Sequence, residues 1–329
     1  MNYNNHIQNI ESNFPNSDLL KESEFSDFND EDFAKYCIDY CVNLTNNAAD
    51  KLNCSLYFGV NYNKKINASA AINNNQAAIT FNFGLIDKLG TIISDTITLF
   101  MKENIACFTI NENQKEELKQ ISYNCCITYL FYHELAHIIQ LLRINEKKSF
   151  NFQENYEEHK SYELRKHIYE FDADLFGSML SGFELMKNVM NEKFEVNTDI
   201  LFNSLTALLF TVANIVIEFS GNLFNKIYYK QNSHPHPFIR IIKIKEQVLE
   251  VISKNLRIDE VFYLTVLQRA TKMISQILYT NSRTLNYEEF YNENSKGIES
   301  YIDEIEDKNI FYKELTRFKP QEFHNKFNI

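Results

Sequence analysis

Apolar and polar residues are arranged differently in the first third of the chain and in the remainder. Residues 1–30 are rich in Asn and acidic side chains without a period, which predicts a loosely ordered segment. An apolar stripe over 31–52 predicts a helix. Residues 55–62, 67–72 and 76–85 are predicted to be strands, and the last of them alternates apolar and polar side chains. These patterns predict a small sheet accompanied by one helix.

From residue 111 onward the apolar periodicity predicts helices almost throughout. The longest covers about 112–144, with Asn111 or Asn113 as its N-cap, and a polar loop over 145–155 follows it. A second helix is predicted over 156–180, with a break at Gly182. Further helices are predicted over 201–219, 223–229, 237–256, 259–280 and 295–318.

The amino-acid composition also favours a mostly helical fold with a small sheet. The chain has 329 residues, 44% of them hydrophobic, which is enough to bury a sizeable core. Only 7 Gly and 4 Pro argue against a turn-rich all-β protein. We therefore predict an α+β, mostly α-helical fold with a small N-terminal sheet. One domain is expected over 31–329, with a mixed part at 31–110 and a helical part at 111–329, after the loosely ordered segment 1–30.

Charge and cysteine content limit the partners and the compartment. The net charge of −11 lacks the basic face that phosphate binding needs, so no nucleic-acid partner is expected. Residues 1–30 have neither the basic start nor the apolar core of a secretory signal. The six cysteines contain no C-x-x-C pair and are expected to be reduced and buried. These features predict a cytoplasmic protein.

One predicted helix, 201–219, is about as long and as apolar as a membrane span. No Lys/Arg cluster marks a cytoplasmic end. Polar side chains also occur along it: Asn203, Ser204, Thr206, Thr211, Asn214 and Glu218. We favour a buried core helix, with membrane association through 201–219 as the open alternative.

The candidate chemistry begins inside the longest predicted helix, at the H-E-x-x-H sequence formed by His133, Glu134 and His137. Histidines four apart on a helix share a face, so both imidazoles can bind one zinc ion. Glu134, next to the first histidine, can hold and deprotonate a metal-bound water. This motif predicts half of a catalytic zinc site.

A catalytic zinc site needs a third protein ligand. The extended H-E-x-x-H-x-x-G-x-x-H class is excluded, because Gln140 and Arg143 occupy its Gly and His positions. The next predicted helix carries Glu170 and Asp174 on one face among large apolar side chains, where carboxylates need hydrogen bonds, ion pairs or a metal. We expect Glu170 to bind the zinc and Asp174 to accept a hydrogen bond from a ligand histidine. Asp172, on another face, is expected to be solvated.

Other residues compete with Glu170 for the third position. His167 is the main rival, because zinc accepts imidazole readily, and Glu163 and His159 lie nearby. Glu170 is favoured because His167 lies at the more polar end of the helix, beside Arg165 and Lys166.

Together the two motifs resemble the gluzincin pattern, H-E-x-x-H followed by E-x-x-x-D. The Ala-Asp ending of the second motif and the later sequence Ser233-His234-Pro235-His236-Pro237-Phe238-Ile239-Arg240 are similar to elements of the CAAX-prenyl-protease-like and heat-shock membrane metallopeptidase group and of its soluble mini-gluzincin relatives. The resemblance covers about half the chain in separated islands. It implies a zincin-like helical core and one zinc ion per chain.

The resemblance also implies roles for individual residues. The zinc ligands would be His133, His137 and Glu170, with Glu134 as general base, Asp174 supporting a ligand, and His234 or His236 near the substrate. The spacing from His137 to Glu170 is short for the membrane members, and their several spans are absent. A soluble relative or a phage-exclusion (Lit-like) peptidase therefore fits better.

Some nearby residues admit two interpretations. The loop with His234 and His236 is either structural or supplies a hydrogen-bond donor to the oxyanion of a tetrahedral intermediate. Arg240 is a candidate partner for Asp174. The strand segment 78–83 is either ordinary sheet or an edge strand that holds an extended peptide beside the zinc.

The sequence thus predicts a zinc-dependent endopeptidase acting on a protein or peptide. The alternative is a catalytically silent or regulatory zinc-binding protein in a defence or stress system. A di-iron helical-bundle oxidase is a remote alternative, since Glu134 and His137 also form an E-x-x-H motif. That architecture needs a second such motif, and no other histidine has a glutamate three residues before it.

Overall fold

The structure is a computed structural model that describes residues 1–15, 17–52, 54–102, 112–144, 150–153, 164–190, 198–221, 226–256, 260–280 and 287–316. Its helices are α1 (Tyr3–Asn13), the 3₁₀ helix η1 (Glu22–Asp27), α2 (Glu31–Ala49), α3 (Phe83–Lys102), α4 (Glu112–Ile144), α5 (Leu164–Val189), α6 (Thr198–Ser220), α7 (Pro237–Leu256), α8 (Glu260–Thr280) and α9 (Tyr287–Thr316). Its strands are β1 (Ser55–Asn61), β2 (Ala68–Asn73), β3 (Gln76–Asn82) and β4 (Phe150–Gln153). The predicted α+β, mostly helical fold with a small sheet is confirmed.

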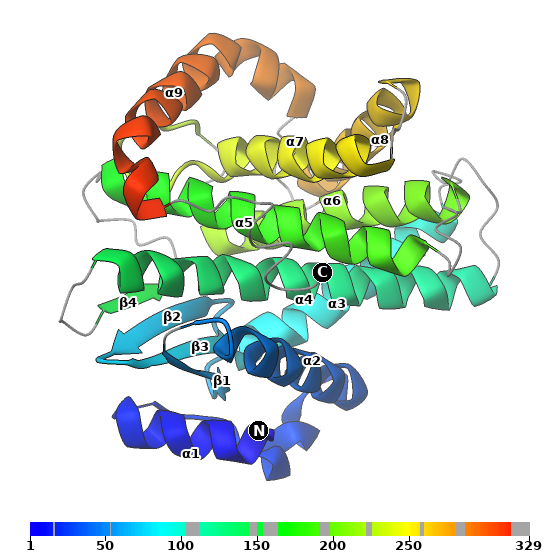
Figure 1. The fold of residues 1–329 in the computed structure, drawn as a ribbon. Coiled ribbons are helices and arrows are strands. Elements are labelled where there is room, and N and C mark those ends of the chain that lie inside the picture. The colour runs from blue at the N-terminus through cyan, green and yellow to red at the C-terminus, as the bar shows by residue number, and fades with distance from the viewer. Residues whose placement is uncertain are drawn as a thin grey trace.

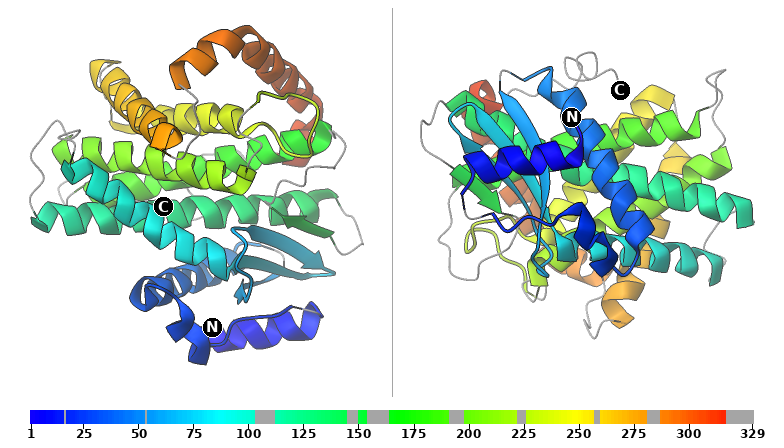
Figure 2. Two further views of the ribbon diagram at one scale, coloured as in Figure 1. Left: turned by 180° about the vertical axis from the view of Figure 1, so that it is seen from behind. Right: turned by 90° about the horizontal axis from the view of Figure 1, so that it is seen from below.

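The helices are stacked in layers on the sheet (Figure 1). Helix α4 packs on β2 and β3, α5 and α6 pack on α4, and α7 packs on both α5 and α6. Helix α1 contacts β1 on the side of the sheet away from α4, whereas α2 contacts both β1 and α4 (Figure 2). The buried apolar side chains of all these layers form one connected core. Helix α4 therefore lies at the centre of the molecule, between the sheet and α5.

The strand order is β1-β3-β2-β4, with β1 parallel to β3 and β2 antiparallel to both neighbours. The segment 78–83 falls largely in β3, in the interior of the sheet, so it is ordinary sheet and not an edge that could hold a peptide. Strand β4 lies inside the segment 145–155 that was predicted to be a loop. It pairs with β2 and forms one edge of the sheet.

The opposite edge of the sheet, at β1, is covered by the N-terminal residues. The backbone N–H of Phe58 donates to His6 Nδ1 (3.3 Å) and that of Val60 to Tyr3 Oη (3.2 Å). Tyr62 N donates to the carbonyl of Asp18 (2.8 Å). Because these bonds occupy donors along β1 that a further strand would need, β4 is the edge of the described sheet that remains for one.

The prediction that residues 1–30 are loosely ordered is wrong. Helix α1, capped by Asn2, and η1 both contribute to the core. Their buried apolar side chains are Tyr3, Ile7, Ile10 and Phe25. Positions 3, 7 and 10 have helical spacing, but this stripe is diluted by Asn and acidic residues and so gave a weak periodic signal.

Several predicted helix ends differ from the structure. Helix α5 continues through Gly182 to Val189, and Gly182 faces Val251 of α7, with the position of an added Cβ 3.3 Å from Val251 Cγ1. Helix α3 was not predicted, because it follows β3 without an intervening turn residue. The predicted helix 223–229 is not formed at 226–229, and its remainder lies outside the described residues, as do 156–163.

Two segments are long and apolar enough to cross a membrane, Glu112–Leu142 and Thr198–Ser220. In each, 94% of the most apolar window is buried inside the protein. Core helices of soluble proteins pass the same test of length and composition. The burial of Thr198–Ser220 agrees with its interpretation as a core helix.

Candidate metal centre

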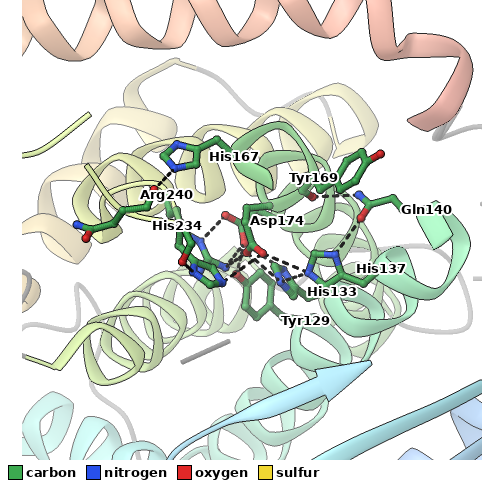
Figure 3. Close-up of polar contacts among 12 residues, drawn as sticks. Tyr129, His133, His137, Gln140, His167, Tyr169, Asp174, His234 and Arg240 are labelled. Carbon is green, nitrogen blue, oxygen red and sulfur yellow. Dashed lines mark hydrogen bonds and ion pairs between the residues drawn. The ribbon is translucent and has the colours of Figure 1, made fainter. Parts of the chain in front are cut away.

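The candidate centre lies between α4 and α5, which pack along each other (Figure 3). His133, Glu134 and His137 come from the middle of α4, and Glu170 from α5. The helices approach closely at Gly177, where an added Cβ would lie 2.7 Å from the carbonyl oxygen of Tyr129. A larger residue at this point would separate the two halves of the centre.

The two histidines and Glu170 form a compact cluster. His133 Nε2 and His137 Nε2 lie 3.2 Å apart. Glu170 Oε2 lies 3.7 Å from His133 Nε2, and Glu170 Oε1 lies 3.6 Å from His137 Nε2. In the part of the chain that the structure describes, this is the one group of three or more His, Cys, Asp or Glu whose ligand atoms all lie within 4.8 Å of one another.

These distances fit a tetrahedral metal ion. Zinc binds imidazole nitrogen and carboxylate oxygen at about 2.0–2.2 Å, so two of its ligand atoms lie roughly 3.3 Å apart. The observed separations of 3.2, 3.6 and 3.7 Å are close to this value. A His₂Glu donor set is also one that catalytic zinc sites use.

The far sides of both imidazoles face hydrogen-bond acceptors. His133 Nδ1 lies 3.1 Å from Asp174 Oδ1, and His137 Nδ1 lies 2.9 Å from Gln140 Oε1. A proton on each Nδ1 leaves a lone pair on each Nε2, and these lone pairs face each other at 3.2 Å. Such lone pairs repel unless a cation lies between them, so the residues fit a metal ion.

Asp174 joins the first histidine to two further residues. Its Oδ1 accepts a hydrogen bond from Tyr129 Oη (2.8 Å), and Arg240 donates to both of its oxygens. Burial on its own would raise the pKa of Asp174, but the charge and hydrogen bonds of Arg240, together with His133, hold that pKa below its usual value. Asp174 is therefore a carboxylate that can accept from His133.

His167, the main rival third ligand, lies away from the cluster. Its Nδ1 bonds to Tyr301 Oη and its Nε2 to the carbonyl of Asn232 (2.8 Å). Burial lowers the pKa of His167 to about 4, so the ring is neutral. It ties the loop before α7 to α5 and α9. The lesser candidates His159 and Glu163 lie outside the described residues.

Only one of the two histidines before α7 faces the cluster. His234 Nε2 lies 3.5 Å from Glu170 Oε1, and its Nδ1 lies 3.0 Å from Ser233 Oγ. His236 instead caps α7, because its Nδ1 accepts from the backbone N–H of Phe238 (3.1 Å). The two interpretations of this loop therefore apply to different residues. His234 faces the site, and His236 has the structural role of a helix cap.

Sequence reasoning missed Tyr129 and Gln140, although both had a readable signal. Tyr129 precedes His133 by one turn, and Gln140 follows His137 by three residues, so each shares a helix face with a ligand.

The expectation that Asp172 is solvated is wrong, since its side chain is only 5% exposed. It lines a cavity of about 270 Å³ between α5, α7 and α9, and Glu170 belongs to the other face of α5.

The centre is closed to bulk solvent in this structure, since His133, Glu134, His137 and Glu170 are each exposed by 3% or less.

Comparisons with protein-family models, with curated proteins and with solved structures found no match to this chain. What the centre can do is therefore inferred from its own residues.

Proposed function

We propose that the protein is a zinc-dependent endopeptidase with one zinc ion per chain. The observation that carries the proposal is the buried cluster of His133, His137 and Glu170, with a glutamate directly after the first histidine. The order of these residues along the chain, and the later His-Pro sequence with Arg240, also support a relationship to the gluzincins. The free, buried cysteines of the described chain favour a reducing compartment such as the cytoplasm.

The three ligands would hold the zinc ion. Zinc in such a site polarises the scissile carbonyl and lowers the pKa of a bound water towards neutrality. Glu134 would take the proton of the attacking water and pass it to the leaving amine. His234, which faces Glu170, would donate a hydrogen bond to the oxygen that becomes negative during attack.

An extended protein or peptide segment is the substrate that this arrangement favours. Strand addition by a peptide would use β4, because the N–H groups of Phe58 and Val60 in β1 are already bonded and β3 is interior. The main-chain bonds of such a strand would hold a peptide with little dependence on its side chains.

Replacement of Glu134 by Gln tests the mechanism. The variant should retain zinc and lose hydrolysis of casein or of extended peptides, because an amide cannot accept the water proton. Glu116→Gln, an exposed change of the same type on α4, is the matched control and should leave activity unchanged. An active Glu134→Gln variant, or wild-type hydrolysis that persists after removal of metal with a chelator, would sink the proposal.

A second candidate is a zinc-binding regulator without catalysis. The observation in its favour is the closure of the centre, in which Glu134 is only 1% exposed. A regulator would bind zinc and show no chelator-sensitive hydrolysis of any peptide in a diverse library. Hydrolysis that needs both zinc and Glu134 would exclude it.

A further inference from the structure

We propose that Gln140 is a positioning residue of the metal centre, which sets the tautomer of His137 and ties this ligand to the backbone beside Glu170. The inference rests on the proposed metal function. It concerns a residue outside both sequence motifs, at the position where the extended zinc motif has glycine.

Gln140 bridges the two helices from a fully buried position. Its Oε1 lies 2.9 Å from His137 Nδ1, three residues earlier on α4. Its Nε2 donates to the carbonyl oxygen of Tyr169 on α5 (3.0 Å), one residue before Glu170 (Figure 3). The side chain has 0% exposure, so water does not compete for either bond.

The second bond determines the orientation of the amide. The carbonyl of Tyr169 can only accept a hydrogen bond, so the NH₂ group of Gln140 must face it. Oε1 therefore faces His137, and because Oε1 is also only an acceptor, His137 must donate from Nδ1. The lone pair of His137 then lies on Nε2, 3.2 Å from His133 Nε2, where a metal ion can use it.

The two ligand histidines are thus positioned by different chemistry. His133 faces the carboxylate of Asp174, whose charge is matched by Arg240. His137 faces a neutral amide, which orients the ring without adding another negative charge beside Glu134 and Glu170. Loss of such supporting groups commonly weakens metal binding by about 10- to 100-fold.

The tautomer of His137 in the metal-free wild-type protein tests the inference without any substitution. Two-bond ¹H–¹⁵N correlation spectra of histidine-labelled protein distinguish Nδ1–H from Nε2–H, and loss of one ring in His137→Ala assigns the signal. We expect the proton of His137 on Nδ1. A proton on Nε2 would overturn the role of Gln140, even if the protein binds zinc. Failure of the wild-type protein to bind zinc would overturn the proposed metal function instead.

Two substitutions then separate positioning from packing. Gln140→Leu removes both polar groups at similar size and should weaken zinc binding about 10- to 100-fold in chelator competition, with loss of the Nδ1–H preference. Gln140→Glu keeps an acceptor facing His137, so it should restore the Nδ1–H tautomer, but it loses the N–H donor to the Tyr169 carbonyl and should recover only part of the zinc affinity. Gln120→Leu, exposed on the same helix, is the control. Unchanged affinity and tautomer in Gln140→Leu, or no recovery in Gln140→Glu, would overturn the inference.

Discussion

Arg240 donates two hydrogen bonds of 2.8 Å to Asp174, from Nε to Oδ2 and from Nη2 to Oδ1. Both side chains are 1% exposed. The pair joins α7 to α5 directly behind His133, whose Nδ1 lies 3.1 Å from the same Oδ1. The first candidate ligand is therefore positioned by a helix far along the chain.

Removal of either partner of this pair should destabilise the fold strongly. Arg240→Met or Asp174→Leu leaves a buried charge uncompensated, which costs about 3–5 kcal/mol. The double substitution should cost clearly less than the sum of the two, because neither member of the pair is left without the other. Urea denaturation measures all three, and Lys254→Met, in an exposed pair with Glu250, is the control that should cost no more than about 1 kcal/mol. Strictly additive losses would show that the pair does not act as a unit.

Two glycines of α5 offer a matched test of the helix contact behind the metal centre. Gly177→Ala would place a Cβ 2.7 Å from the Tyr129 carbonyl and 3.3 Å from His133 N, so α4 and α5 must move apart. We expect lower stability and weaker zinc binding. Gly182→Ala has its tightest contact with the side chain of Val251, at 3.3 Å, and gains helix propensity of up to about 1 kcal/mol. Equal effects of the two changes on zinc affinity would refute this reasoning.

The sequence predicted the parts of the fold whose apolar period is strong. Helix α7 was predicted with its observed bounds, because Pro237 marks its first turn. Helix α4 was also predicted with its own observed bounds. Helix α1 was missed because its apolar stripe lies among Asn residues. The interior position of β3 could not be read from its alternation, because strand order depends on pairing between distant segments.

For the site, the spacing of residues along one helix could be read from the sequence, whereas the contacts between helices could not. The shared face of His133 and His137, and that of Glu170 and Asp174, followed from the helical period. Which face of α5 meets α4 depends on packing, so the choice between Glu170 and His167 needed the structure. The same holds for the loop before α7, where His234 faces the cluster and His236 caps the helix.

Burial of His167 should make stability depend on pH. Its folded-state pKa of about 4 lies below the ordinary value of 6.5, so the unfolded chain takes up a proton that the folded protein does not as the pH falls below 6.5. Its contribution to stability is therefore present above pH 6.5 and is lost between 6.5 and about 4, by on the order of 3 kcal/mol. His167→Gln removes this titration. The difference in unfolding free energy between wild type and variant should change across this window and be flat above it; a difference independent of pH would contradict the neutral state of the ring.

Metal content of the purified protein is the most direct test of the central claim. Wild-type protein and His167→Gln should each hold about one zinc ion per chain, because both ring nitrogens of His167 are bonded away from the cluster. Glu170→Ala should hold little or none, as it loses the third ligand. Full zinc content in Glu170→Ala, loss of zinc in a folded His167→Gln variant, or a wild-type protein without a stoichiometric metal would contradict the account.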